Sequence, residues 1–299
     1  MQVFIQKYRL SYENGLVSKF SKNKKKLYSY LKSLSKSSPQ PQLLIHNSTP
    51  INDQNQIAEL FNSFFNSTFT NSDYSLPPID SLPSPSLQLN KIEINSSDVY
   101  TALSKLDPTK AMGHDNINPK ILKFCALALA DPITSLFSKC LKSGNIPSEW
   151  KVHKICPVHK KGSKLDVKNF RPISLLCIIS KVLESLIYDK VINFIRPLLS
   201  VRQFGFLNNR SCLTQLLTSF SEIFQSIDDK KVTDVVYFDF RKAFDSVPHD
   251  ELLFKLWSLG ITGELWFWFK NYLKNRTHYV SIDGSDSNYK PVISGVPQG

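Results

Sequence analysis

A run of β-forming residues at 235–240 constrains the fold of this chain most. All of its members are apolar or aromatic except one acid, Asp239. A strand that is apolar on both faces belongs inside a sheet that other elements cover. Because an unpaired buried carboxylate is costly, Asp239 would need a hydrogen bond, an ion pair or a metal ion. We therefore expect a central strand in which Asp239 binds metal, pairs with Arg241 or Lys242, or caps the next turn.

Composition sets the class of protein and of partner. The chain has 299 residues, of which 41% are hydrophobic, enough for a packed interior and for about two domains. Its net charge of +12 predicts a polyanionic partner, either nucleic acid or an acidic membrane surface, and the clustering of the basic residues favours nucleic acid. No apolar run approaches the length of a membrane span.

The five cysteines are scattered and form no CxxC pair. Neither a structural zinc site nor a disulfide framework is indicated, and a reducing intracellular compartment fits best.

Hydrophobic periodicity predicts mixed helices and strands. The long helix that begins at Pro119 is expected to bend near Pro132 and to stop at Gly144. A Ser/Pro linker is expected over 35–41, and a domain boundary in the Ser- and Pro-rich residues 70–90. The predicted helices cover 15–34, 53–69, 97–106, 119–142, 174–195, 211–227, 249–259 and 262–275; the predicted strands cover 152–158, 235–240, 279–283 and 291–294.

Residues suited to phosphate chemistry surround the predicted strand. Upstream lie Lys154, Lys160, Lys161 and Arg171, which can grip phosphate as point charges or as a planar fork. Downstream lie an aromatic residue, Phe244, and a glycine-flanked loop, 295–299, whose backbone can approach a ligand closely. Together with Asp239 they suit a phosphoryl-transfer site that uses divalent metal.

Seven blocks in series resemble the reverse transcriptase of non-LTR (LINE-type) retrotransposons, in order and in spacing, over about residues 96–299. The first block departs from the family's pattern at His114 and Asn116, where the family usually has Pro and Gly. The blocks are Gly113-His114-Asp115-Asn116-Ile117, Ile146–Lys151, Ile155–Gly162, Asn169–Leu176, Gln203–Phe206, Phe238–His249 and Gly295–Gly299.

The resemblance implies a role for each matched site residue. Asp239 would be the first catalytic carboxylate and would ligate two Mg²⁺ ions, one of them with the backbone carbonyl of Phe240. Phe244 would be the steric gate that excludes a ribose 2′-OH. Arg171, with Lys160 or Lys161, would hold the incoming triphosphate. Gln298 and Gly299 would line the nucleotide and template pocket.

The resemblance also implies an α/β (α+β) fold: right-hand polymerase fingers and a partial palm over 96–299, after a mostly helical, basic extension over 1–95. The partners would be an RNA template, a DNA primer and dNTPs, with no membrane, in a ribonucleoprotein of cytoplasm and nucleus. The family's second acidic motif, Tyr/Phe-x-Asp-Asp, follows the Gly loop in the family and does not occur in these 299 residues. We therefore expect RNA-directed DNA polymerase ancestry but little or no activity from this chain.

Two other functions stay open. One is a non-catalytic RNA-binding remnant that uses the positive charge alone, and the other is a group II intron-type maturase.

Purely structural roles are expected for several other residues. Asp245 is expected to be structural. The histidines 114, 153, 159, 249 and 278 are expected at the surface or in loops. The aromatic helix with Trp266 and Trp268, preceded by Trp257, is expected to pack against the palm rather than to stack on bases.

Overall fold

The computed structural model describes residues 2–18, 24, 27, 30, 40–78 and 81–298. The chain divides into two compact units, Met1–Gln42 and Leu43–Gly299. The first unit contains the helix α1 (Gln2–Ser18). Most of the predicted basic helix 15–34 and of the linker 35–41 lies outside the described residues.

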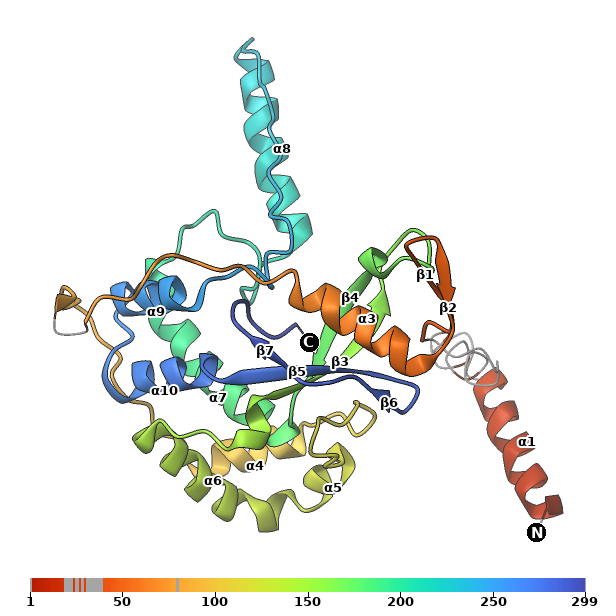
Figure 1. The fold of residues 1–299 in the computed structure, drawn as a ribbon. Coiled ribbons are helices and arrows are strands. Elements are labelled where there is room, and N and C mark those ends of the chain that lie inside the picture. Colours follow the sequence, from red (N-terminus) through yellow and green to blue (C-terminus); the bar gives the residue numbers. More distant parts are fainter. Residues whose placement is uncertain are drawn as a thin grey trace. The chain divides into compact units, whose positions relative to one another are not determined.

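The second unit combines helices with a small sheet (Figure 1). Its α-helices are α3 (Gln54–Asn66), α4 (Ser96–Ser104), α5 (Pro119–Phe124), α6 (Ala126–Ser143), α7 (Ile178–Ile195), α8 (Cys212–Asp228), α9 (His249–Ser258) and α10 (Gly263–Leu273). Its strands are β1 (Leu44–His46), β2 (Thr49–Ile51), β3 (Val152–His159), β4 (Phe170–Leu175), β5 (Arg276–Ile282), β6 (Ser285–Asp286) and β7 (Lys290–Val292), and short 3-10 helices cover Ser148–Lys151, Val167–Asn169 and Arg196–Leu198.

The sheet has the order β4-β3-β5-β6, and β7 also pairs with β5. β3 is antiparallel to β4 and parallel to β5, so residues more than a hundred positions apart, such as Lys154 and Tyr279, lie opposite each other. The predicted strands at 152–158 and 279–283 are confirmed. β4 was not predicted, because the helix expected from residue 174 begins only at Ile178.

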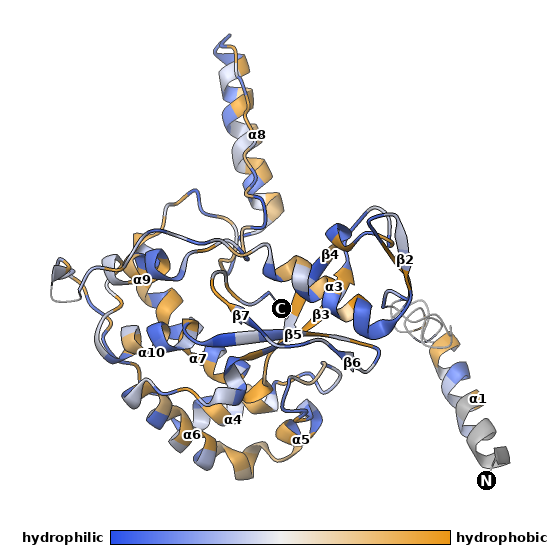
Figure 2. Cartoon of the chain, in the orientation of Figure 1, coloured by the Kyte–Doolittle hydropathy of each residue, from blue (hydrophilic) through white to orange (hydrophobic). Residues whose placement is uncertain are grey.

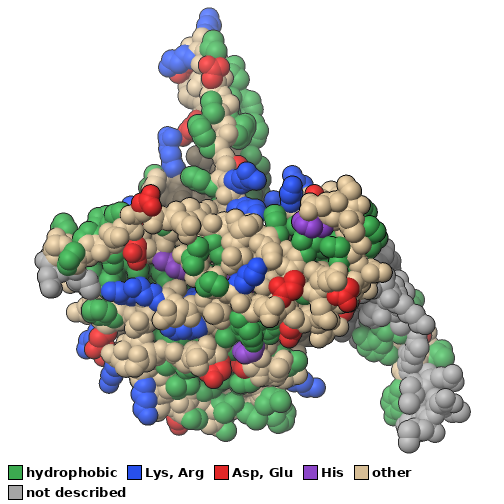
Figure 3. All heavy atoms as spheres, viewed as in Figure 1, with side chains coloured by type: hydrophobic (Ala, Val, Ile, Leu, Met, Phe, Trp, Pro, Cys, Tyr) green, Lys and Arg blue, Asp and Glu red, His purple; other side chains and the backbone are tan. Residues whose placement is uncertain are grey.

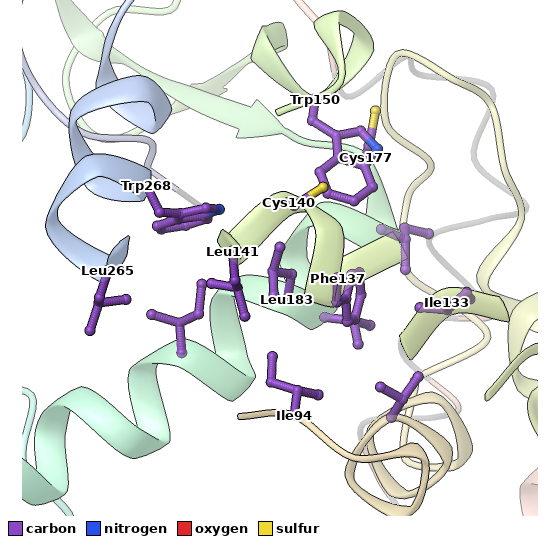
Figure 4. Packing of buried hydrophobic residues seen from close by; sticks show 14 of the residues in the cluster. Ile94, Ile133, Phe137, Cys140, Leu141, Trp150, Cys177, Leu183, Leu265 and Trp268 are labelled. Atoms are coloured by element: carbon purple, nitrogen blue, oxygen red, sulfur yellow. The ribbon is translucent and has the colours of Figure 1, made fainter. Parts of the chain in front are cut away.

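Helices α4, α6, α7, α9 and α10 enclose the larger hydrophobic core. Figure 4 shows part of it, where Phe137, Leu183 and Trp268 converge from α6, α7 and α10. Trp266 is completely buried and Trp268 nearly so, which confirms packing as the role of the aromatic helix.

The second core lies between α3 and the sheet. Asp53 caps α3 through the backbone N–H of Gln56, and the apolar face that the sequence predicts there is buried. Phe61 meets Phe170 of β4 edge to face, with ring centroids 4.9 Å apart. α3 therefore belongs to the same compact unit as the sheet. The compact units do not coincide with the expected division at residue 95, which stays a prediction from the resemblance.

The predicted strand at 235–240 is wrong. These residues have no regular secondary structure and are exposed, with Phe238 at 91%. The physical reason is the lack of a partner: a strand is held by hydrogen bonds to a neighbouring strand, and no described strand pairs with this segment.

Helix α8, just upstream, is formed as predicted, with Ser211 as its cap, but none of its residues is buried. Figure 2 shows hydrophobic residues along its length, and Figure 3 shows hydrophobic side chains on its surface. The exposed apolar side chains are Leu213, Leu216, Leu217, Phe220, Phe224 and Ile227. Its amphipathic pattern thus produced a helix without a covered face.

The long helix that the sequence predicts is divided in two in the structure. The helix predicted over 119–142 breaks at Cys125, which caps α5, and Pro132 lies inside α6. Gly144 ends α6 in the left-handed conformation, as predicted.

The five cysteines form no disulfide with one another. In the described part of the chain, every helix is too short or too polar to span a membrane.

Candidate active site

Backbone hydrogen bonds join the turn after Asp239 to the loop that begins at Ser294. The N–H of Val296 donates to the carbonyl oxygen of Phe244 at 2.8 Å, and the N–H of Gly295 donates to that of Val247 at 2.7 Å. His249, the first residue of α9, lies with its Nε2 2.9 Å from the carbonyl oxygen of Gly295. The two segments therefore form one layer, although about fifty residues separate them in the chain.

Gly295 makes this close approach possible. Its φ is +83°, and an added Cβ would lie 2.6 Å from the carbonyl oxygen of Phe244. Any other residue would collide with rigid backbone there. The sequence predicts close backbone approach at this glycine, and in the structure the approached group is the turn.

Ser294 ties a third segment to the same place. Its side chain is fully buried; Oγ accepts from the backbone N–H of Thr70 at 2.8 Å and donates to the carbonyl oxygen of Asp245 at 2.7 Å. Sequence reasoning did not identify Ser294, since a single serine beside a glycine loop carries no signal of a contact 224 residues away.

Gln298 and Asp245 complete the junction. The side-chain Nε2 of Gln298 donates to Asp245 Oδ1 at 2.9 Å, and the backbone carbonyl oxygen of Gln298 accepts from the N–H of Ser174, on β4, at 2.6 Å. Burial raises the pKa of the Asp245 carboxyl, while the Gln298 hydrogen bond and the charge of Lys242 lower it. Lys242 Nζ itself lies over the Phe64 ring of α3, 4.2 Å from its centroid.

A cavity of about 30 Å³ lies at this junction. It is much too small to hold a nucleotide. Asp245, Ser294 and Gln298 line it, together with residues of α3, β3, β4, β5 and β7.

Two buried histidines also line this cavity, His153 and His278, which corrects the expectation that they lie at the surface or in loops. His278 is 2% exposed and its Nε2 has no hydrogen-bond partner among the described residues. Burial lowers its pKa to about 4.

His153 belongs to a buried polar network. Its Nε2 accepts from Arg276 Nε, while the guanidinium also donates to the carbonyl oxygens of Tyr272 and Trp150, at 2.8 and 3.1 Å. Burial and the charge of Arg276 lower the pKa of His153 well below its usual value. The histidine must be neutral to accept this bond, and sequence reasoning missed the pair because β3 and β5 become neighbours only in the fold.

The remaining predicted site residues are exposed. Asp239 lies in the irregular segment and makes no hydrogen bond or ion pair with the described residues, so neither burial nor pairing with Arg241 or Lys242 is observed. Phe244 is 43% exposed, and its ring meets that of Phe206 edge to face at 6.2 Å. Asp245 was expected to have a structural role, and it accepts hydrogen bonds from Ser294 and Gln298 of the loop.

The basic residues lie along β4 and the turn before it. Arg171 is exposed on β4, three residues before Ser174, whose N–H holds Gln298. Lys160 and Lys161 are exposed where β3 ends. Gly299 lies outside the described residues. The structure thus brings together the 242–249 turn, the loop and β4, and leaves Asp239 apart from them.

A metal ion has few ligands here. Within the described ranges, no group of three or more His, Cys, Asp or Glu side chains could hold one. The two ligands expected from the sequence, Asp239 and the carbonyl of Phe240, amount to one carboxylate and one backbone oxygen, fewer ligands than two Mg²⁺ ions require.

Sequence comparison relates this chain to a family of known proteins. The family described as "Reverse transcriptase (RNA-dependent DNA polymerase)" matches residues 158–299. The chain is 30% identical over 217 residues to the RNA-directed DNA polymerase from mobile element jockey of Drosophila melanogaster, covering 72% of this chain and 23% of that protein. It is 31% identical over 227 residues to the probable RNA-directed DNA polymerase from transposon BS of the same species, covering 74% and 25%.

A third relative, the probable RNA-directed DNA polymerase from transposon X-element of Drosophila melanogaster, is 30% identical over 205 residues, covering 68% of this chain and 22% of that protein. The chain spans about a quarter of the length of these curated relatives. It belongs to the reverse transcriptase family, among the polymerases of LINE-type, non-LTR retrotransposons.

Proposed function

We propose that the second unit supplies the nucleotide-holding part of an RNA-directed DNA polymerase. The observation that carries the proposal is the junction itself. The family resemblance implicates three segments, and two of them, the turn after Asp239 and β4, are each hydrogen-bonded to the third, the 294–298 loop. Such positioning is the main source of catalysis in phosphoryl transfer, where the protein orients reactants and neutralises charge.

Each segment contributes a different chemical group. Arg171, on β4, supplies a guanidinium for the triphosphate, and Lys160 and Lys161 supply mobile charge beside it. Phe244 limits the space at the sugar, which favours deoxynucleotides. Gln298 contacts the nucleotide from the loop. In the reaction a primer 3′-OH attacks the α-phosphate and pyrophosphate leaves.

Asp239 is proposed as a metal-binding carboxylate. Mg²⁺, when bound, neutralises phosphate charge and polarises the reacting oxygens. Because Asp239 is a single exposed carboxylate, the described residues do not complete a two-ion site. We accordingly expect nucleotide binding from this chain with little or no extension of a primer.

The finer fold assignment is part of the same proposal. Residues 96–299 correspond to the fingers and the first part of the palm, after the helical extension over 1–95. The basic composition fits RNA and DNA as partners, in a ribonucleoprotein of cytoplasm and nucleus.

Equilibrium binding of dTTP and UTP in Mg²⁺ tests this proposal. We expect dTTP to bind more tightly than UTP, Phe244→Ala to reduce the difference, and Arg171→Ala to weaken both nucleotides. Lys139→Ala, a cation on α6, is the matched control for Arg171→Ala. Equal affinity of all variants for both nucleotides would contradict the proposal.

The exposed position of Asp239 also supports a second candidate, a non-catalytic RNA-binding function. That function predicts RNA affinity that falls steeply with salt and is unchanged by Asp239→Ala. Mg²⁺-dependent dTTP binding that Asp239→Ala weakens would exclude it.

A further inference from the structure

The contact between Asp245 and Gln298 determines which atom of the glutamine is available to a ligand. A side-chain amide has a donor end, Nε2, and an acceptor end, Oε1, and an ionised carboxylate can only accept. Asp245 Oδ1 lies 2.9 Å from the amide, so Nε2 faces Asp245. Oε1 is then the free end, and it accepts no hydrogen bond from the described residues.

Both partners are held in place by other contacts. The backbone carbonyl of Gln298 accepts a hydrogen bond from the N–H of Ser174. Earlier in the loop, the N–H groups of Gly295 and Val296 donate to carbonyl oxygens of the turn. The backbone of Asp245 is fixed by the Ser294 hydroxyl and by its own N–H, which donates to Lys242 at 2.9 Å. The hydrogen bond therefore joins two rigid segments, and the amide cannot turn over without losing it.

We propose that Asp245 is a positioning residue that fixes the Gln298 amide with Nε2 inward, so that Oε1 is the atom offered to the nucleotide. The proposal rests on the nucleotide-binding function proposed above. It limits what Gln298 recognises: a carbonyl-type acceptor selects a hydroxyl or amino donor of the nucleotide and disfavours a phosphate oxygen. The hydrogen bond between Asp245 and Gln298 also links the 294–298 loop to the segment that carries Asp239, six residues upstream of Asp245.

The first test is the side-chain amide signal of Gln298 in the 299-residue chain, observed by NMR with ¹⁵N-labelled glutamine. Gln298→Ala assigns the signal by removing it. We expect the amide protons to shift with pH in a single transition whose midpoint lies above the usual 3.8 of an aspartate. The transition should disappear in Asp245→Asn and persist in Asp234→Asn, an exposed control with the same change of charge. A signal that is insensitive to Asp245→Asn would overturn the proposal.

The second test is a double-mutant cycle for dTTP binding in Mg²⁺. Asn at 245 can donate as well as accept, so Asp245→Asn lets the amide take either orientation and should weaken binding up to about tenfold, the value of one hydrogen bond. In a Gln298→Ala background the same change should have no effect, because Asp245 acts through Gln298. Equal weakening in both backgrounds would overturn the positioning role.

The two tests separate the two claims. If dTTP does not bind, or binds without regard to Arg171 and Phe244, the proposed function fails, and the amide signal still decides whether Asp245 orients Gln298. Circular dichroism of Asp245→Asn and Asp245→Ala shows that each variant is folded, and Asp245→Ala must lose the same amide transition.

Discussion

His278 should make the stability of the second unit depend on pH. Its ring is buried against Phe69, with ring centroids 5.4 Å apart, and its pKa is lowered from 6.5 to about 4 by burial and, secondarily, by the charge of Lys290. Asp245 and His153 line the same cavity. A base whose pKa is lower in the folded state binds its proton more readily when unfolded, so protonation favours unfolding.

The size of the effect follows from the two pKa values. A fall from 6.5 to about 4, at about 1.36 kcal/mol per pH unit, corresponds to about 3 kcal/mol. This contribution is complete above pH 6.5 and is lost as the pH falls from 6.5 to about 4. Between pH 7 and pH 5 the loss should be about 2 kcal/mol.

Urea denaturation at pH 7.0, 6.0 and 5.0, followed by tryptophan fluorescence, measures this effect. Burial also lowers the pKa values of His153 and His249, so the wild-type protein should lose more than the amount from His278 alone. The difference between the wild type and His278→Gln isolates one histidine, and His46→Gln, at an exposed histidine of β1, serves as the control. If the wild type and His278→Gln lose the same free energy of unfolding between pH 7 and pH 5, the account of His278 is wrong.

Three further predictions concern core packing, the junction and the exposed segment 229–241. Phe61→Ala should lower the free energy of unfolding by about 3–5 kcal/mol, because it removes a fully buried ring that packs on Phe170; a loss below 1 kcal/mol in urea denaturation would contradict this. Gly295→Ala should weaken dTTP binding and lower the thermal midpoint. Gly284 has a similar positive φ but open space for a Cβ, so Gly284→Ala should lower the thermal midpoint only by the cost of backbone strain. Limited proteolysis should cut first within 229–241, which is exposed and irregular, and a first cut inside β3 or β5 would contradict the fold.

Local patterns predicted elements well where their own residues supply the contacts. α3 carries its apolar face within thirteen residues, and that face is buried as predicted, with Asp53 as the cap just before the helix. The same reasoning failed at 235–240, because β-propensity describes how a residue fits a sheet and cannot supply the neighbouring strand. β4 was missed for the opposite reason: its residues lie beside a helix signal, and antiparallel pairing with β3 decides their conformation.

The candidate site divides in the same way. The resemblance identified the residues of the turn, of the loop and of the block 169–176, which forms β4, because these sequence blocks keep the family's order. The residues that join them, Ser294, Asp245 and His249, were not assigned to the site because their partners are distant in sequence. The buried pair of His153 and Arg276 likewise arises only when β3 and β5 lie side by side.

Photo-crosslinking of a deoxynucleoside triphosphate analogue, followed by mass spectrometry of the labelled peptides, tests the central claim most directly. Our account predicts labels in residues 242–249, in the 294–298 loop and on β4, all competed away by unlabelled dTTP. Labels confined to other surfaces, such as the groove between α4 and α7, or labels that dTTP does not displace, would contradict it.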